Sequence, residues 1–251
     1  MIDVVKDNYT LMFGDCLERM KEIPDGSIDL ILTDPPYQTT QNKWDSMIDL
    51  DDMFRELNRV INKNSCILLF GAEPFSSRLR LSNIKDYKYD WYWKKQKPTG
   101  FYNCKKQPLK DIETISVFRT GKYIPQGLVD CHINSGRKNK GGNGNYSNSK
   151  EDYIQTQGNY PRQVLEFSKE NKSIHPTQKP VALLEYLIKT YTQEGETVLD
   201  FTFGSCSTGV ACLNTNRKAI MIEKDPHYFK IGSERMKMAL SEKVINQNPS
   251  L

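Results

Sequence analysis

The stretch Ile28-Asp29-Leu30-Ile31-Leu32-Thr33-Asp34-Pro35-Pro36-Tyr37 is the most informative part of this sequence, because it combines a strand pattern with a group of reactive side chains. A short apolar run that stops at two prolines predicts a buried strand, because proline has no N–H with which to continue a sheet. The strand end therefore presents an acid, rigid carbonyl acceptors and an aromatic ring, at Asp34, Pro35, Pro36 and Tyr37. This group suits a planar substrate that carries an amino group, since the backbone here offers acceptors and few donors.

Along the whole chain, apolar runs alternate with helical patterns. This alternation predicts an α/β fold with a mostly parallel sheet. The predicted strands cover residues 9–13, 30–33, 66–70, 89–94, 114–119, 197–199 and 219–222, and the predicted helices cover residues 50–61, 180–192, 207–214 and 225–240.

Four of the predicted strands run into an acid, namely Asp15, Asp34, Asp200 or Glu223. A single acid at a strand end is most simply a cap of the next helix. In open α/β sheets, however, ligands bind outside the carboxyl ends of the strands. Four acids at such ends favour a shared polar site at one edge of the sheet.

A turn of small residues, 201–209, follows Asp200 and leads into a helical pattern. Such a turn lets backbone N–H groups approach a ligand. It has neither the dinucleotide G-x-G-x-x-G spacing nor a Walker loop, which disfavours a dehydrogenase. Glu223 ends the next strand about 20 residues later, where an acid hydrogen-bonds ribose hydroxyls. These features favour an adenosine-containing cofactor without a pyrophosphate.

The bulk properties exclude several classes of protein. The 251 residues, 37% hydrophobic and 26% charged, predict a single domain over residues 1–251. No apolar run approaches the ~20 residues that cross a membrane, and the N-terminus has no signal-peptide pattern, so we expect a cytoplasmic protein without membrane contact. The six cysteines form no C-x-x-C pair and the three histidines lie far apart. We therefore expect reduced thiols and no metal site.

Basic residues concentrate between Arg78 and Lys110, although the net charge is only +4. Aromatic residues are interleaved with them, and such a basic stripe is typical of a phosphate-binding surface. The alternative is a solvated basic face beside strand residues that pack in the core. The expected contacts to phosphates are Lys94, Lys95, Lys97, Lys105 and Lys106.

The α/β pattern breaks between Gly121 and Ser173. The centre of this segment, residues 137–150, is polar, basic and rich in Gly and Asn, with too few apolar residues to form a core. It is either a floppy surface insertion or a loop that orders on a partner. We favour the second, because the segment follows the basic stripe, and we expect contacts from Arg137, Lys138 and Lys140.

In its motifs the chain resembles the S-adenosylmethionine-dependent DNA amino-methyltransferases, in their beta-class arrangement. The resemblance covers nearly the whole chain and rests on residues 14–17, 28–37, 175–180 with Leu183-Leu184, and 200–209. The last block resembles the family loop D-x-F-x-G-S-G-T-T-G. Cys206 replaces its second glycine, which would cost roughly 1 kcal/mol if that position needs a positive φ.

The resemblance implies a Rossmann-like, seven-stranded, mostly parallel sheet with one antiparallel strand and a circularly permuted motif order. It also implies that the region between the two halves, about 121–173, is a target-recognition insertion. The implied cofactor is S-adenosyl-L-methionine, held by Phe13, Gly14, Asp15, Cys16, Asp34, Thr177, Lys179, Asp200, Phe201, Thr202, Phe203, Gly204, Ser205, Ser207, Thr208 and Glu223.

The implied reaction is site-specific methylation of the N6 amino group of adenine in double-stranded DNA, by base flipping and direct transfer. Asp34 and the Pro35 carbonyl would accept the two amine hydrogens, and Tyr37 would stack on the flipped base.

Cytosine N4 is the alternative, although cytosine enzymes more often carry Ser at the position of Asp34. RNA and protein amino-methyltransferases more often carry Asn there. A DNA-binding protein without catalysis would show damage at residues 34–37. The sequence leaves open a homodimer and a cognate restriction enzyme.

Overall fold

The computed structural model describes residues 1–37, 48–134, 154–168 and 178–247. Contacts divide the chain into a main unit, Met1–Ile124 with Gln163–Leu251, and a small unit, Pro125–Arg162. Both halves of the predicted site belong to the main unit. The small unit lies inside the predicted insertion of residues 121–173 and is shorter than it at both ends.

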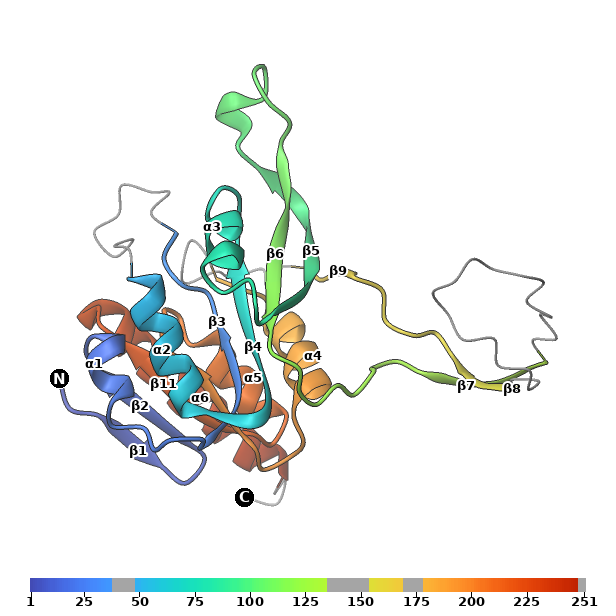
Figure 1. Ribbon diagram of the computed structural model, residues 1–251. Coiled ribbons are helices and arrows are strands. Elements are labelled where there is room, and N and C mark those ends of the chain that lie inside the picture. The colour runs from blue at the N-terminus through green and yellow to red at the C-terminus, as the bar shows by residue number, and fades with distance from the viewer. Residues whose placement is uncertain (38–47, 135–153, 169–177, 248–251) are drawn as a thin grey trace. The chain divides into compact units, whose positions relative to one another are not determined.

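Within the described residues, the main unit contains a nine-stranded sheet in the order β1-β2-β11-β10-β3-β4-β6-β5-β9 (Figure 1). Strands β2, β11, β10, β3 and β4 run parallel, and β6 is antiparallel to both of its neighbours. The strands are β1 (Val4–Lys6), β2 (Tyr9–Phe13), β3 (Ile28–Thr33), β4 (Ile61–Gly71), β5 (Tyr87–Thr99), β6 (Lys110–Phe118), β9 (Val164–Glu166), β10 (Thr197–Asp200) and β11 (Lys218–Glu223).

The predicted mostly parallel α/β fold is confirmed, but the predicted seven strands are too few. The consecutive strands from β2 to β5 in the sheet order match the prediction, with β6 as their antiparallel member. The described part of the sheet adds β1, antiparallel to β2, at one edge and β9 at the other. The permuted order is confirmed, because the late strands β10 and β11 lie between the early strands β3 and β2. Three-residue edge strands are too short to show a periodic pattern, which is why the sequence did not reveal them.

Helices cover both faces of this sheet (Figure 1). Helices α1 (Cys16–Met20), α2 (Leu50–Val60) and α3 (Phe75–Ser82) pack in one hydrophobic cluster, and α4 (Val181–Tyr191), α5 (Ser207–Asn214) and α6 (Pro226–Gln247) pack in the other. The predicted helices at 50–61, 180–192, 207–214 and 225–240 are confirmed, although α6 extends further. In the described part of the chain, no helix is long and apolar enough to cross a membrane.

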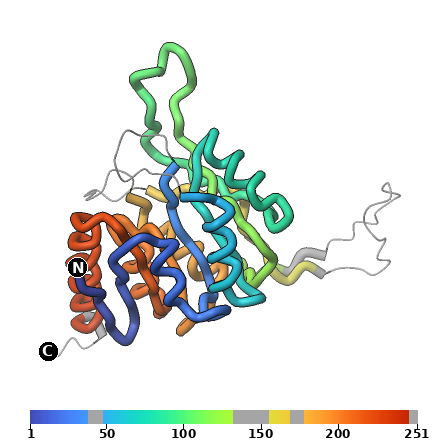
Figure 2. Tube along the Cα trace, turned by 60° about the vertical axis from the view of Figure 1, so that its left-hand side comes forward, coloured from blue at the N-terminus to red at the C-terminus, as the bar shows by residue number. Residues whose placement is uncertain are grey.

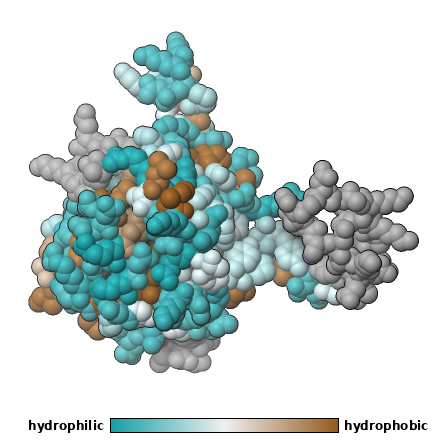
Figure 3. Space-filling view, viewed as in Figure 1, coloured by the Kyte–Doolittle hydropathy of each residue, from teal (hydrophilic) through white to brown (hydrophobic). Residues whose placement is uncertain are grey.

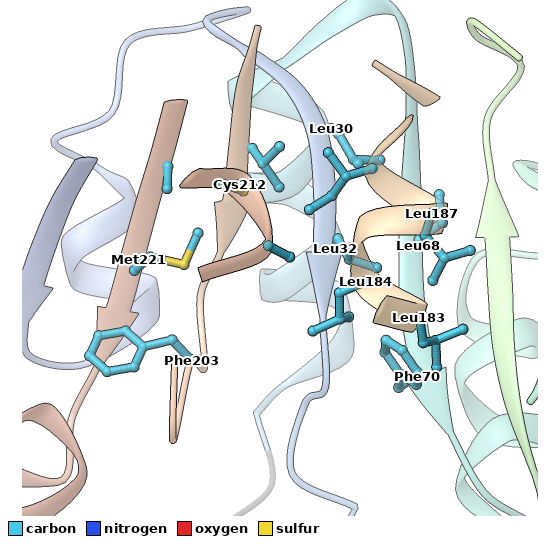
Figure 4. Packing of buried hydrophobic residues seen from close by; sticks show 14 of the residues in the cluster. Leu30, Leu32, Leu68, Phe70, Leu183, Leu184, Leu187, Phe203, Cys212 and Met221 are labelled. Atoms are coloured by element: carbon cyan, nitrogen blue, oxygen red, sulfur yellow. The ribbon is translucent and has the colours of Figure 1, made fainter. Parts of the chain in front are cut away.

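The central strands are buried on both faces, so their side chains alternate between the two clusters. Leu30 and Leu32 of β3 point toward α4 and α5, whereas Ile31 points toward α1 and α2. Figure 4 shows Leu183 and Leu184 of α4 beside the side chains of these central strands. This packing fixes β3, and with it the position of Asp34 directly after the strand.

Strands β5 and β6 continue beyond the carboxyl ends of β3 and β4 as a two-stranded arm, residues 93–113, whose first residues Trp93 and Lys94 still pair with β9 (Figures 1 and 2). Gly71, the last residue of β4, pairs with Thr114, which pairs with Tyr92 of β5. The remaining residues of β5 therefore extend roughly 20 Å past the carboxyl ends of β3 and β4. A short 3-10 helix, η1 (Phe101–Asn103), lies at the outer end of the arm.

The small unit contains the antiparallel pair β7 (Val129–Asn134) and β8 (Ile154–Gly158). The predicted partner-contacting centre, residues 137–150, lies outside the described residues. One part of the predicted insertion belongs to the main sheet, because β9 (Val164–Glu166) pairs in parallel with β5.

Candidate active site

The four acids predicted to share a site do meet at one edge of the sheet. Strands β2, β11, β10 and β3 are parallel neighbours, so Asp15, Glu223, Asp200 and Asp34 follow in that order along their carboxyl ends. All four line one cleft of about 1190 Å³, its open mouth included. Pro35, Pro36 and Tyr37 line the same cleft. The helix-cap alternative is also partly correct, because Asp15 accepts hydrogen bonds from the backbone at the start of α1.

Asp200 joins the predicted cofactor turn to the predicted catalytic stretch. Its Oδ1 accepts hydrogen bonds from the Thr33 hydroxyl at 2.6 Å and from the Thr202 backbone N–H at 3.1 Å. The Thr202 hydroxyl in turn donates to the backbone carbonyl of Asp34 at 3.1 Å. Burial raises the pKa of Asp200 to about 6, although the hydrogen bond from Thr33 opposes this rise. The two segments are thus fixed against each other by short polar contacts.

Glu223 is held in place by backbone donors. Its two carboxylate oxygens accept from the N–H groups of Gly204, at 2.9 Å, and Asp225, at 2.8 Å. Burial raises the pKa of Glu223, and both hydrogen bonds oppose the rise. A carboxylate fixed in this way still has lone pairs free to accept hydrogen bonds from a ligand hydroxyl.

Cys206 has φ of 59° and ψ of 34°, in the left-handed region that favours glycine. The thiol is fully buried. A Cβ added at Gly209 would lie 2.6 Å from the Cys206 sulfur, and one added at Gly232 would lie 3.1 Å from the Cys206 Cβ. The side chain therefore occupies the space between α5 and α6 that these two glycines leave.

Asp34 is the first of four side chains of alternating charge that contact one another in turn. Its carboxylate contacts the ammonium of Lys179 and the hydroxyl of Tyr37. Lys179 Nζ also lies 3.3 Å from Oε2 of Glu113, whose Oε1 lies 3.2 Å from Lys95 Nζ. Burial raises the pKa of Asp34, and the Lys179 charge opposes this rise. Burial also acts to raise the pKa of Glu113, but the charges of Lys179 and Lys95 outweigh it and hold that pKa below its usual range.

Comparisons with known proteins agree with this geometry. A family model described as DNA methylase, for N6 and N4 methylases, matches residues 28–234, which include the Asp34 stretch and the 201–209 turn. The chain belongs to this DNA methylase family. It is therefore a member of a family of enzymes.

Relatives of this DNA methylase include the DNA adenine methyltransferase YhdJ of Escherichia coli (strain K12). The two are 30% identical, over 92% of this chain and 83% of the relative. Type II methyltransferase M.HinfI of Haemophilus influenzae is 25% identical, over 91% of this chain and 68% of that protein.

Among solved structures, the M1.HpyAVI–SAM complex superposes with a TM-score of 0.62 at 25% identity, covering 91% of this chain and 98% of that one. The cytosine-N4-specific PvuII DNA methyltransferase has a TM-score of 0.67 at 17% identity, covering 94% and 92%. This second likeness shows the shared fold alone.

The structure places most of the residues that the family resemblance implies. Phe13 is not among the residues that line the cleft, and its ring packs edge-on against Phe229 with centroids 5.3 Å apart. Thr177 lies outside the described residues. The remaining implied cofactor residues line the cleft: Gly14, Asp15, Cys16, Asp34, Lys179, Asp200, Phe201, Thr202, Phe203, Gly204, Ser205, Ser207, Thr208 and Glu223.

Only some of the lysines expected to contact phosphates are exposed. Lys95 is 7% exposed and paired with Glu113, so the prediction of a phosphate contact for Lys95 is wrong. Lys94 forms an exposed ion pair with Glu166 at 3.1 Å. Lys97, Lys105 and Lys106 are exposed on the arm, whereas Arg137, Lys138 and Lys140 lie outside the described residues.

Sequence reasoning missed some side chains that complete the site. Glu113 carried no signal, because it lies in the middle of a strand and reaches Lys179 only through tertiary packing. Tyr37, predicted to stack on a base, stacks on Phe75 with ring centroids 4.9 Å apart. The residues that line the cleft and were missed are Thr33, Ile48, Phe70, Gln178, Leu184, Lys224 and Tyr228.

Proposed function

We propose that this DNA methylase transfers a methyl group from S-adenosylmethionine to the N6 amino group of adenine in duplex DNA. One observation carries the proposal: Asp34, at the end of β3, lines the same cleft as Asp200 and Glu223. An acceptor for an amino group and two acids suited to an adenosine cofactor are thereby held in one space.

The donor set of the cleft fits this cofactor. Glu223, fixed by two backbone N–H groups, suits the ribose hydroxyls, and the side chains of Phe201 and Phe203 offer apolar walls to a flat ring. Asp15 and Asp200 supply negative charge for a cofactor that carries both a sulfonium and an ammonium group. When bound, S-adenosylmethionine supplies a methyl group that its sulfonium already activates.

The residues of the catalytic stretch act on the amino group. The lone pair of an exocyclic amine is delocalised into the ring, which makes it a poor nucleophile. Asp34 and the Pro35 carbonyl accept its two hydrogens and so favour a tetrahedral nitrogen with an available lone pair. Holding that nitrogen in a fixed direction supplies much of the rate enhancement. Because a duplex hides the amino group, the base must leave the helix to reach Asp34.

Adenine is the favoured base over cytosine. Asp34 stands where cytosine enzymes of this arrangement more often carry Ser, and YhdJ, at 30% identity, is named a DNA adenine methyltransferase. The cytosine-specific PvuII enzyme shares the fold, so the fold does not choose between the two bases. Cytosine N4 is the second candidate, and the product separates them.

DNA contacts fall on two regions. Lys97, Lys105 and Lys106 lie exposed on the arm, which extends past the edge of the sheet that holds the cleft. Their positive charge supports contacts to phosphates, which set affinity. The segment 121–173 is the proposed target-recognition region, whose contacts to base edges set sequence choice.

The test is single-molecule sequencing of DNA from cells that express the wild type or Asp34→Ala, with mass spectrometry of the digested nucleosides. We expect N6-methyladenine at one sequence motif with the wild type and none with the variant. Asp34→Ala should still fold, because Lys179 keeps its partner Glu113, and circular dichroism checks this. N4-methylcytosine as the product would favour the second candidate. Near-normal methylation by Asp34→Ala would overturn the catalytic assignment.

A further inference from the structure

Two adjacent aromatic side chains occupy the outer end of the arm. Phe101 is 78% exposed and Tyr102 is 99% exposed, and both belong to η1. Gly100 directly precedes them with φ of 87°, a left-handed conformation that turns the chain at the end of β5. Aromatic side chains are among the main contributors to cores and interfaces. A pair held in solvent at the end of two strands adds little to the fold and is available to a partner.

The charge around this pair indicates the kind of partner. Residues 97–110 include four lysines and no acid. All four, Lys97, Lys105, Lys106 and Lys110, are exposed. Figure 3 shows a largely hydrophilic surface over this part of the arm. Aromatic rings surrounded by cations are typical of surfaces on which nucleic-acid bases stack while phosphates are neutralised.

The position of the arm indicates where on the DNA it would act. The arm extends roughly 20 Å past the edge of the sheet at which Asp34 lies. A duplex whose target base enters the cleft would therefore run alongside the arm. The major groove of B-DNA, about 12 Å wide, admits a two-stranded β-ribbon. Aromatic and apolar side chains that enter a groove can insert between base steps and unstack them.

We propose that Phe101 and Tyr102 stack on bases of the bound duplex and help to open the helix for the target base. This inference rests on the proposed function, because it takes duplex DNA as the partner of the cleft. It assigns to the arm an action distinct from the phosphate contacts of its lysines. A base that is already unpaired should need this action less.

The first experiment separates stacking from charge. Fluorescence anisotropy with a labelled duplex, which carries the motif found by sequencing, is measured across a salt series for two double variants. Phe101→Ala with Tyr102→Ala should lose roughly ten- to a hundredfold in affinity with an unchanged salt dependence. Lys105→Gln with Lys106→Gln should instead flatten the salt dependence, by up to about two units of slope. An unchanged affinity of the aromatic variant would overturn the proposal.

The second experiment tests the opening of the helix. The aromatic variant should methylate a matched duplex slowly and recover most of its rate on a duplex with a mismatch opposite the target adenine. Equal loss on both duplexes would contradict a role in opening. Tyr102→Trp in a Trp44→Phe background gives a direct probe, because its fluorescence should be quenched when duplex DNA is added, whereas the remaining Trp91 and Trp93 are buried. An unquenched signal would also contradict stacking.

The outcomes separate this inference from the function on which it rests. If the wild type methylates no DNA, the proposed function fails. If the wild type methylates DNA and the aromatic variant matches it in affinity and rate, only the inference fails. A wild type that dimerises in light scattering, beside a monomeric aromatic variant with normal DNA affinity, would assign the surface to a second copy of the chain.

Discussion

Glu113 Oε2 lies 3.3 Å from Lys179 Nζ, and the same ammonium group contacts the carboxylate of Asp34. Asp34, Lys179, Glu113 and Lys95 form a series of two half-buried acids and two buried lysines. Glu113 therefore balances the charge that Lys179 brings to the site. Without that balance, a cation would face the amino nitrogen as it gains positive charge during methyl transfer.

Glu113→Gln should lower kcat roughly ten- to a hundredfold with little change in the KM for DNA. It should also shift the pH profile. The negative charge of Glu113 acts to raise the pKa of Asp34, so its removal lowers that pKa and keeps Asp34 ionised to lower pH. The acidic limb of the plot of kcat against pH should therefore shift to lower pH. Glu166→Gln is the matched control, because it removes an acid that pairs with the neighbouring Lys94 on the surface. Identical profiles for wild type and Glu113→Gln would remove Glu113 from the mechanism.

Glu223→Ala should weaken cofactor binding more than DNA binding. Losing a hydrogen bond to a charged group typically costs ~1.5–3 kcal/mol, or roughly ten- to a hundredfold in affinity. Calorimetry with S-adenosylhomocysteine measures the first effect, and anisotropy with duplex DNA measures the second. Glu223→Gln keeps an acceptor for the Gly204 N–H and should lose less. Unchanged affinity in Glu223→Ala would mean that the cofactor lies elsewhere.

Asp200→Asn should stabilise the protein at neutral pH, because burial raises the pKa of Asp200 from 3.8 to about 6. Between these two values the folded state holds a proton that the unfolded state has lost, so stability falls as the pH rises through this window. The shift corresponds to at most about 3 kcal/mol. Asn keeps an oxygen to accept from Thr33 and Thr202. Urea titrations from pH 4 to 8 should show a smaller loss of stability in the variant, and parallel curves would refute the expectation.

Cys206→Gly should bind the cofactor at least as tightly as the wild type. Glycine relieves a left-handed backbone by roughly 1 kcal/mol, while removal of the buried thiol costs a similar amount. Cys206→Ala is the matched control, since it loses the sulfur and keeps the backbone strain, so it should be the least stable of the three. Calorimetry with S-adenosylhomocysteine and thermal unfolding test both expectations. A marked loss of affinity in Cys206→Gly would show that the packed thiol shapes the turn.

The central strands, the longer helices and the acids at the strand ends could all be predicted from the amino-acid sequence. These features are local, because an apolar run, a proline stop or a run of small residues carries its own conformational preference. The Asp34-Pro35-Pro36-Tyr37 stretch and the turn after Asp200 were recognisable for this reason. Their meeting followed from the rule that parallel strands end at one edge of the sheet.

Which charged side chains form ion pairs and which are exposed to water could not be predicted, because this depends on tertiary packing. Lys95 and Lys97 are two residues apart on β5. Lys95 is buried and pairs with Glu113, whereas Lys97 is exposed. They differ because only the inner part of β5 packs against other elements of the main unit. The sequence predicted only a cofactor contact for Lys179. In the structure its ammonium also contacts Asp34, because segments far apart in the chain pack together. Such contacts depend on which elements become neighbours, and the energy of a buried charge is set by those neighbours and not by adjacent residues in the sequence.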